Sequence, residues 1–229
     1  YGGIMKTLTL YHGSTDIIEA PVFGKGKTYN DYGQGFYCTE NMELAREWAC
    51  LEGIDGYVNR YTINLDHLSV LNLRDPKYSI LHWLTILTEN RKLRISTPAM
   101  RRGVEWLQNH FHIDTAAYDA IIGYRADDSY FSFARAFLTN QISLAQLSYA
   151  MKLGKLGEQF VLMSRKAFDT VRFEGYEAVD SSVYYVKRKA RDEEARSSYL
   201  KVLEEADENG IYMRDITRGE VKPDDLRLQ

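Results

Sequence analysis

Residues 31–39 read DYGQGFYCT, in which two glycines precede a short run of aromatic and β-favouring residues. The glycines indicate a turn, which the Asp31 side chain is expected to cap. The residues after the turn, 35–39, predict a short strand. A phosphate-binding glycine loop would need a helix directly after the glycines, whereas a strand follows here.

A helix is expected after this strand. Thr39 is the expected N-cap, and Glu40 lies in the first turn, where a negative charge is favourable. Apolar residues continue at helical spacing through Trp48 and Ala49, and the pattern stops near Gly53.

Two further short motifs lie at the ends of predicted strands. Residues 6–12 alternate leucine with polar residues and predict a strand, so the motif YHGS at 11–14 lies at its end. Residues 159–164 predict another strand, and the motif GEQF at 157–160 lies at its start.

The rest of the chain mixes strand and helix patterns, which predicts the α+β class. Residues 5–180 are expected to form one α+β domain, and residues 181–229 a charged, helical C-terminal extension. The other predicted strands are 57–65, 68–73, 118–124, 171–173 and 177–179. The predicted helices are two within 78–110 that are divided at Pro98, then 129–139, 144–153 and a single turn at 166–168. A charged helix is predicted from 183 to Gly210, and a polar tail follows it.

Composition excludes several classes of protein. The 229 residues include 29 Lys and Arg against 32 Asp and Glu, a net charge of −3, so duplex nucleic acid is not the expected ligand. No apolar run is long enough to cross a membrane. Cys38 and Cys50 are too few for a disulfide framework or a metal site, so we expect reduced thiols, no bound metal and a cytoplasmic protein.

Together the motifs resemble the catalytic domain of ADP-ribosyltransferases of the diphtheria-toxin and poly(ADP-ribose) polymerase type. HGS at residues 12–14 matches the first motif, residues 32–37 match the second, and Trp48 follows Tyr37 by eleven residues. Over residues 8–180 the chain is similar to a bacterial family of unknown function in the same clan, which often occurs in toxin–antitoxin pairs. The shared segments are 11–14, 31–39, 48–49, 118–123, 126–128 and 159–160.

The resemblance implies a split β-sandwich of the ADP-ribosyltransferase type, with helical insertions and a cleft for NAD as co-substrate. His12 is expected to bind the adenosine ribose, and Gly13 and Ser14 the nicotinamide carboxamide. Tyr37 and Trp48 are expected to stack on the two faces of the nicotinamide ring.

One position departs from the resembled pattern. Gln159 stands where that pattern has a glutamate that binds the nicotinamide ribose, and Glu158 precedes it. Neighbouring residues of a strand point to opposite faces, so only one can face the site unless a bulge intervenes. An uncharged Gln159 supports an oxocarbenium-like transition state less well, which favours transfer of a single ADP-ribose or an inactive NAD-binding module.

Other charged residues have two interpretations each. Asp127 and Asp128 either cap the helix that follows or supply a general base, and Asp128 is the catalytic candidate beside Gln159, Tyr37 and His12. The basic cluster at 187–191 precedes acidic residues, so we expect a solvated helix face that pairs with itself. The alternative is a contact with a partner or nucleic acid.

We therefore expect an NAD-dependent mono-ADP-ribosyltransferase, an intracellular bacterial toxin that a cognate antitoxin protein neutralises. The acceptor can be protein, DNA, RNA or a small molecule. The alternatives are a non-catalytic NAD-binding or interaction module and an NAD glycohydrolase, in which water is the acceptor.

Overall fold

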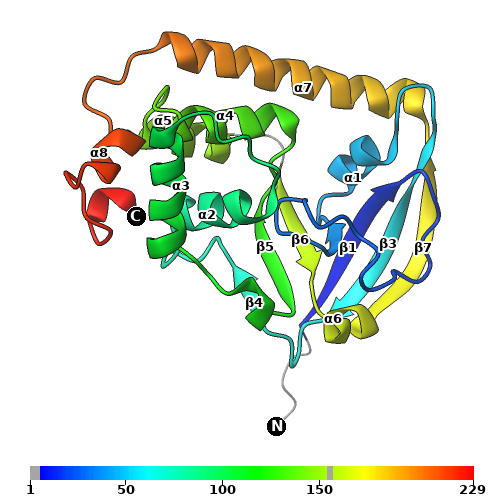
Figure 1. Cartoon of the computed structure of the whole chain (residues 1–229). Helices are drawn as coiled ribbons and strands as arrows, with labels where there is room; N and C mark the ends of the chain where they lie inside the picture. The colour runs from blue at the N-terminus through cyan, green and yellow to red at the C-terminus, as the bar shows by residue number, and fades with distance from the viewer. Residues whose placement is uncertain (1–5, 154–156) are drawn as a thin grey trace.

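The computed structural model describes residues 6–153 and 157–229, and Figure 1 shows how their elements are arranged. In chain order the elements are β1 (Thr7–Ser14), β2 (Phe36–Cys38), α1 (Met42–Ala49), β3 (Gly56–Asn64), β4 (Val70–Asn72), α2 (Ile80–Asn90), α3 (Pro98–His110), the 3-10 helix η1 (Thr115–Ala117), β5 (Ala120–Tyr124), α4 (Asp128–Leu138), α5 (Leu144–Leu153), β6 (Glu158–Leu162), α6 (Arg165–Thr170), β7 (Val171–Val179), α7 (Ser181–Glu204), α8 (Met213–Thr217) and the 3-10 helix η2 (Leu226–Leu228).

Two sheets form the framework. The first has the strand order β1-β3-β7 and is antiparallel throughout. The second has the order β2-β6-β5-β4, in which only β4 and β5 run parallel. The sheets meet where Tyr11 of β1 donates to the Thr39 carbonyl at 2.8 Å and accepts from the Thr39 N–H at 2.9 Å. The predicted α+β class is confirmed.

The second sheet carries a separate core on each face, because side chains alternate along its strands. Phe36 and Phe160 pack into a cluster that includes Leu10 and Tyr61 of the first sheet. Tyr37 packs instead against a larger cluster that α2, α3 and α4 build with the opposite face. Figure 1 shows these helices gathered on the side of the second sheet away from β1, β3 and β7.

Helix α1 begins two residues later than predicted. Its N-cap is Asn41, whose Oδ1 accepts from the Leu44 N–H at 3.2 Å. The expected cap at Thr39 is wrong, because the backbone of Thr39 is already paired with Tyr11. Tertiary pairing thus delays the helix start.

Two glycines let α1 lie directly on the first sheet. A Cβ at Gly13 would overlap the carbonyl oxygen of Ala45 and come within 2.7 Å of the Ala49 nitrogen. A Cβ at Gly56 would overlap the Ala49 carbonyl group and lie 2.9 Å from the Ser14 oxygen. A side chain at either glycine would therefore displace the helix.

The other helices mostly follow the predicted pattern. Pro98 opens α3 at its first helical position, where a missing N–H costs nothing, and the predicted division between α2 and α3 is confirmed. Thr97 caps α3, and Ser79 caps α2 together with His82.

Strand β7 is continuous, whereas the sequence predicts two fragments. Opposite β3 the register shifts, so that Arg60 pairs with Gly175 while Tyr61 pairs with Phe173. Glu174 is the extra residue of this bulge, and Gly175 has a φ of 143°, which favours glycine. The prediction of two strands is wrong because a bulge interrupts the alternation of side chains without ending the strand.

The C-terminal segment packs on the same core as the rest. Helix α7 begins after the Asp180 N-cap, two residues before the predicted start at 183, and runs along the top of the molecule in Figure 1. The tail expected to be polar contains α8, and Met213 and Ile216 of α8 are buried in the cluster of α2, α3 and α4. Residue 5, the expected start of the domain, lies outside the described residues. Among those described, no helix is both long and apolar enough to cross a membrane.

We expect Gly13→Ala to lower the free energy of unfolding by about 3 kcal/mol, because the added methyl group overlaps the α1 backbone. Gly24→Ala is the matched control, since Gly24 has a φ of 81° and no atom within 4 Å of an added Cβ. That control should cost about 1 kcal/mol from backbone strain alone. Urea denaturation measures both changes, and equal losses would contradict the proposed role of Gly13.

Candidate functional site

His12 joins the two sheets near the end of β1. Its Nδ1 lies 2.6 Å from the Tyr37 carbonyl oxygen, and its ring stacks on Phe36 with centroids 4.2 Å apart. A carbonyl only accepts, so Nδ1 carries the proton and Nε2 is left as an acceptor. Burial lowers the pKa of His12 below its ordinary value of 6.5, although the bond to Tyr37 opposes the change. The ring is therefore neutral at pH 7 and can accept a hydrogen bond from a hydroxyl group.

Gly13 presents its backbone at the edge of the first sheet. Backbone groups of an antiparallel strand alternate in direction, and those of Tyr11 point to Thr39 of the second sheet. The N–H and C=O of Gly13, two residues later, point to the same side. In the described part of the chain, no turn, loop or inter-sheet hydrogen bond ends on Gly13. This pair of groups matches the donor and acceptor of a carboxamide.

Ser14 is the last residue of β1. Its Oγ accepts from the Asp16 N–H at 3.1 Å, which starts a turn after the strand. By alternation the Ser14 side chain leaves the strand on the same face as His12. Its hydroxyl proton is available for a ligand, because the bond to Asp16 uses only the oxygen.

The Tyr37 hydroxyl holds the turn that precedes β2. It donates to the Gly33 carbonyl at 2.6 Å and accepts from the Tyr32 N–H at 3.0 Å. The side chain lies on the helix-covered face of the second sheet, opposite to Phe36. His12 therefore contacts the backbone of Tyr37, while the Tyr37 ring points to the other face.

Gln159 lies on β6, between β2 and β5. Val161 belongs to the helix-covered face, so alternation places the Gln159 side chain on the face of Tyr37 and Glu158 on the opposite face. The Gln159 side chain is buried, and among the described residues its Oε1 has no hydrogen-bond partner. A buried acceptor without a partner costs about 1–3 kcal/mol, which a ligand hydroxyl would recover.

A cavity of about 260 Å³ lies at this end of the second sheet. We call it the Gln159 cavity, and its lining includes Thr39, Asn41, Leu44, Gly157, Glu158 and Gln159. Glu158 forms an ion pair with Arg74 at 3.1 Å. Burial raises the pKa of Glu158, and the attraction of Arg74 opposes this effect.

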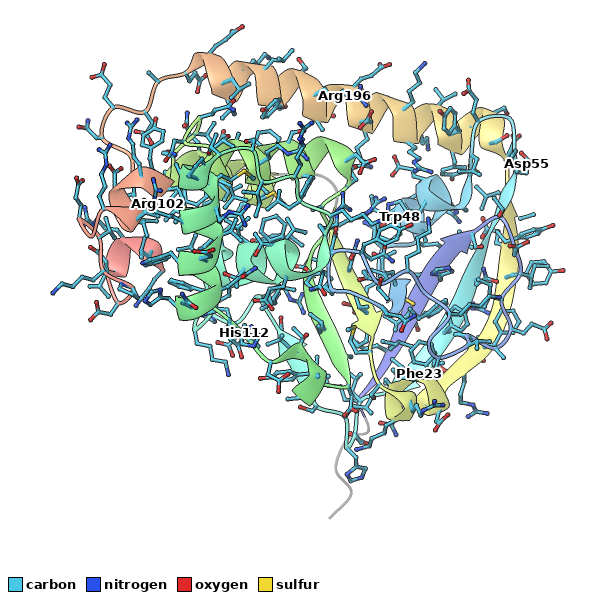
Figure 2. All side chains as sticks on the ribbon, in the orientation of Figure 1. Phe23, Trp48, Asp55, Arg102, His112 and Arg196 are labelled. Carbon is cyan, nitrogen blue, oxygen red and sulfur yellow. The ribbon has the colours of Figure 1, made fainter. Side chains whose placement is uncertain are left out.

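Trp48 lies in a different cavity, of about 360 Å³, between α1, α7 and the segment 125–128. We call it the Trp48 cavity, and its lining includes Glu47, Trp48, Arg125, Asp127, Asp128 and Arg188. Figure 2 shows Trp48 beneath α7. The Arg125 guanidinium covers one face of the Trp48 ring, 4.2 Å from its centroid. The structure thus brings His12 and Gly13 to the backbone of Tyr37, whose ring points to the other face. It places Trp48 and Gln159 in separate cavities, to both of which α1 contributes.

The two adjacent aspartates have different surroundings. Asp127 accepts from the Tyr130 N–H at 3.0 Å, as expected of a helix cap. Asp128 is almost fully exposed and pairs with Arg91 at 3.1 Å. A base at Asp128 would therefore work from the solvent side of the Trp48 cavity.

Asp31 does not cap the turn of Gly33 and Gly35. Its buried carboxylate reaches across to the second sheet, where it accepts from the Ala126 N–H at 2.8 Å and pairs with Arg91 at 3.2 Å. The expected turn cap is wrong because Asp31 bonds instead to Ala126 and Arg91, which only the tertiary fold brings near it. Burial raises the pKa of Asp31 to about 6, more than Ala126 and Arg91 lower it.

Arg91 and Arg125 also belong to this region, although no motif in the sequence indicated them. Arg91 joins Asp31 to Asp128 and donates to the Ala126 carbonyl at 3.3 Å. Arg125 directly follows β5, and its position at the end of a predicted strand was the only feature of the sequence that could have marked it as a candidate site residue. Within the described ranges, no three His, Cys, Asp or Glu side chains are grouped to hold a metal ion.

The stability of the wild-type chain and of Asp31→Asn should depend differently on pH. Between pH values of about 4 and about 6 the folded wild type keeps a proton on Asp31 that the unfolded chain has released, so wild-type stability falls as pH rises. The asparagine of the Asp31→Asn variant keeps an acceptor oxygen but does not titrate, so the stability of the variant does not fall in this way as pH rises. We expect the free energy of unfolding of Asp31→Asn, relative to wild type, to rise by about 3 kcal/mol from pH 4 to pH 7 in urea titrations. A difference that stays constant over this range would contradict the raised pKa.

Comparison with known proteins adds a family assignment. A family model described as "Protein of unknown function (DUF3990)" matches residues 8–173. The match runs from β1 into β7, so it includes every candidate site residue from His12 to Gln159 and leaves α7 and α8 outside. No curated protein and no solved structure matches the chain. Because the matched segment covers more than half of the sequence, the chain belongs to the DUF3990 family.

Proposed function

We propose that the protein is an NAD-dependent mono-ADP-ribosyltransferase with a split β-sandwich of the ADP-ribosyltransferase type. The observation that carries the proposal is the convergence of two distant motifs. His12 of the first motif bonds to the Tyr37 carbonyl of the second, 25 residues away in sequence. Strand β6, which carries Gln159, pairs directly with β2. The three motifs that resemble the enzyme family therefore lie on adjoining strands.

The free polar groups near β1 and β6 match the functional groups of NAD. Ribose hydroxyls are donors, and both His12 Nε2 and Gln159 Oε1 are acceptors without a described partner. The carboxamide of nicotinamide has one acceptor and one donor side, which suits the N–H and C=O of Gly13. The Ser14 hydroxyl can donate to the same carboxamide.

In the proposed reaction the bond between the nicotinamide nitrogen and ribose C1′ breaks. Its electron pair leaves with nicotinamide, and positive charge develops on the sugar. A nucleophile of the acceptor then bonds to C1′ and loses its proton, for which Asp128 is the candidate base. Gln159 can orient the ribose through its amide oxygen but adds no negative charge. Loss of such electrostatic support costs about 3 kcal/mol, or a hundredfold in rate, which is why we propose transfer of a single unit rather than chain growth.

A second candidate is a non-catalytic NAD-binding module. The uncharged Gln159 favours it, as does the Arg125 guanidinium that covers one face of Trp48. Under both proposals NAD binds beside Gly13. They differ only in whether the glycosidic bond is cleaved.

The test uses NAD labelled in its adenosine part, with the purified chain and a bacterial lysate. We expect label on a macromolecule, and protease or nuclease sensitivity then identifies the acceptor class. Free ADP-ribose alone would indicate an NAD glycohydrolase, and bound but intact NAD a binding module. We also propose that the chain is a toxin held by an antitoxin, in which case its expression alone should arrest growth and the Gln159→Ala variant should not.

Gln159→Glu should raise the rate of NAD cleavage by up to about a hundredfold, because the new carboxylate faces the developing charge. Gln159→Ala should lower the rate, and its fold is checked by circular dichroism. Glu158→Ala is the matched control and should change cleavage less than Gln159→Ala does. Glu158 borders the same cavity, but alternation directs its side chain to the other face of β6, where it pairs with Arg74. If Glu158→Ala abolishes cleavage and Gln159→Ala does not, Glu158 is the catalytic residue instead. If Gln159→Glu does not fold, the comparison of the two alanine variants still decides between these positions.

A further inference from the structure

The lining of the Trp48 cavity includes five Lys and Arg side chains and five Asp and Glu side chains, and not all of them pair with one another at contact distance. Most of its carboxylates have a partner already. Glu47 accepts from Nε and Nη2 of Arg191 at 3.1 and 2.9 Å, and Asp192 pairs with Arg196 at 3.1 Å. Asp128 pairs with Arg91, which approaches from α2.

Two arginines remain without such a partner. Within the ranges that the structure covers, no carboxylate oxygen lies within 4 Å of the guanidinium groups of Arg125 or Arg188. Arg125 is stacked on Trp48, and Arg188 donates from Nη1 to the Cys50 carbonyl at 3.0 Å. Both side chains are partly buried and line the Trp48 cavity.

The two charges act on each other and on their surroundings. Burial lowers the pKa of Arg125 to about 10, with Arg188 adding to the decrease and Asp127, Asp31 and Glu47 opposing it from longer range. Arg125 nevertheless stays charged at pH 7. Two cations held in one partly desolvated cavity repel each other, and an anion between them would relieve that repulsion.

We propose that the Trp48 cavity binds a phosphate group between Arg125 and Arg188. Guanidinium groups present paired N–H donors in a plane, which suits the oxygens of phosphate and diphosphate. Two arginines match the charge of a dianion better than that of a single carboxylate. Trp48 keeps the Arg125 guanidinium in place from one face, so one donor set is oriented before the ligand arrives.

The proposal does not depend on NAD cleavage, because it concerns phosphate recognition alone. A phosphate group in this cavity can belong to a dinucleotide that also reaches Gly13, or to a separate phosphate-bearing ligand. Both sources share the same chemistry, and competition separates them.

The test is isothermal titration of the full chain with pyrophosphate at constant ionic strength. We expect Arg125→Gln and Arg188→Gln each to weaken pyrophosphate binding at least tenfold. Arg227→Gln is the matched control, since it removes the same charge from an exposed arginine that pairs with Asp225 outside the Trp48 cavity, and it should change binding less than twofold. Equal weakening in all three variants would show attraction by net charge only and overturn the proposal, as would a wild-type chain that does not bind pyrophosphate.

Further measurements keep this result separate from the proposed function. If Arg125→Gln does not fold, Arg188→Gln carries the comparison, because its side chain lies on the outer helix α7. NAD that competes with pyrophosphate assigns the phosphate site to the dinucleotide. Pyrophosphate binding can instead depend on both arginines and be unaffected by NAD. That result supports the phosphate site and contradicts the binding of NAD beside it. Acetate at the same concentration should not compete, and competition by acetate would contradict the preference for phosphate.

Discussion

The direct contact of α1 with the backbone of β1 and β3 is the constraint on which the arrangement of the site depends. Its two contact points are Gly13 and Gly56, where any side chain would overlap the helix backbone. A helix can approach a sheet this closely only where no Cβ lies between them. The contact keeps α1 at one end of the first sheet. Glu47 and Trp48, which lie on α1, are therefore held at a fixed position relative to Gly13 of β1.

The segments around α1 are joined mainly by hydrogen bonds to backbone groups. The Tyr32 hydroxyl donates to the Tyr124 carbonyl at 2.6 Å, and Asp31 accepts from the Ala126 N–H. These bonds connect the turn before β2 to the segment after β5. Because backbone groups do not move with side-chain rotamers, the position of Arg125 in the Trp48 cavity follows from the path of the chain. His12 extends this connection to the first sheet through the Tyr37 carbonyl.

Helix α7 covers the Trp48 cavity and is held there by an ion pair with α1. Arg191 of α7 forms two hydrogen bonds with Glu47 of α1, whose carboxylate is buried. The basic cluster at 187–191 therefore pairs largely across helices, and the expectation of a face that pairs with itself is wrong for Arg191. A buried carboxylate needs a charged partner, and α1 offers Glu47 at the position that α7 crosses. Arg188 lies one turn earlier on α7, where no carboxylate in the described part of the chain comes within 4 Å of its guanidinium group.

Local pattern was enough to predict the main strands, the helices divided at Pro98 and, to within two residues, the start of α7, because alternation, proline geometry and capping act within a few residues. The motifs at His12, Tyr37 and Gln159 could likewise be found from the sequence. Only the tertiary structure decided the partner of Asp31, the cap of α1, the bulge in β7 and the cavity that Trp48 faces. Each of these depends on atoms brought together from far along the chain, as with Asp31 and Ala126, which are 95 residues apart. Burial and long-range pairing, which no local pattern encodes, determine what those side chains contact.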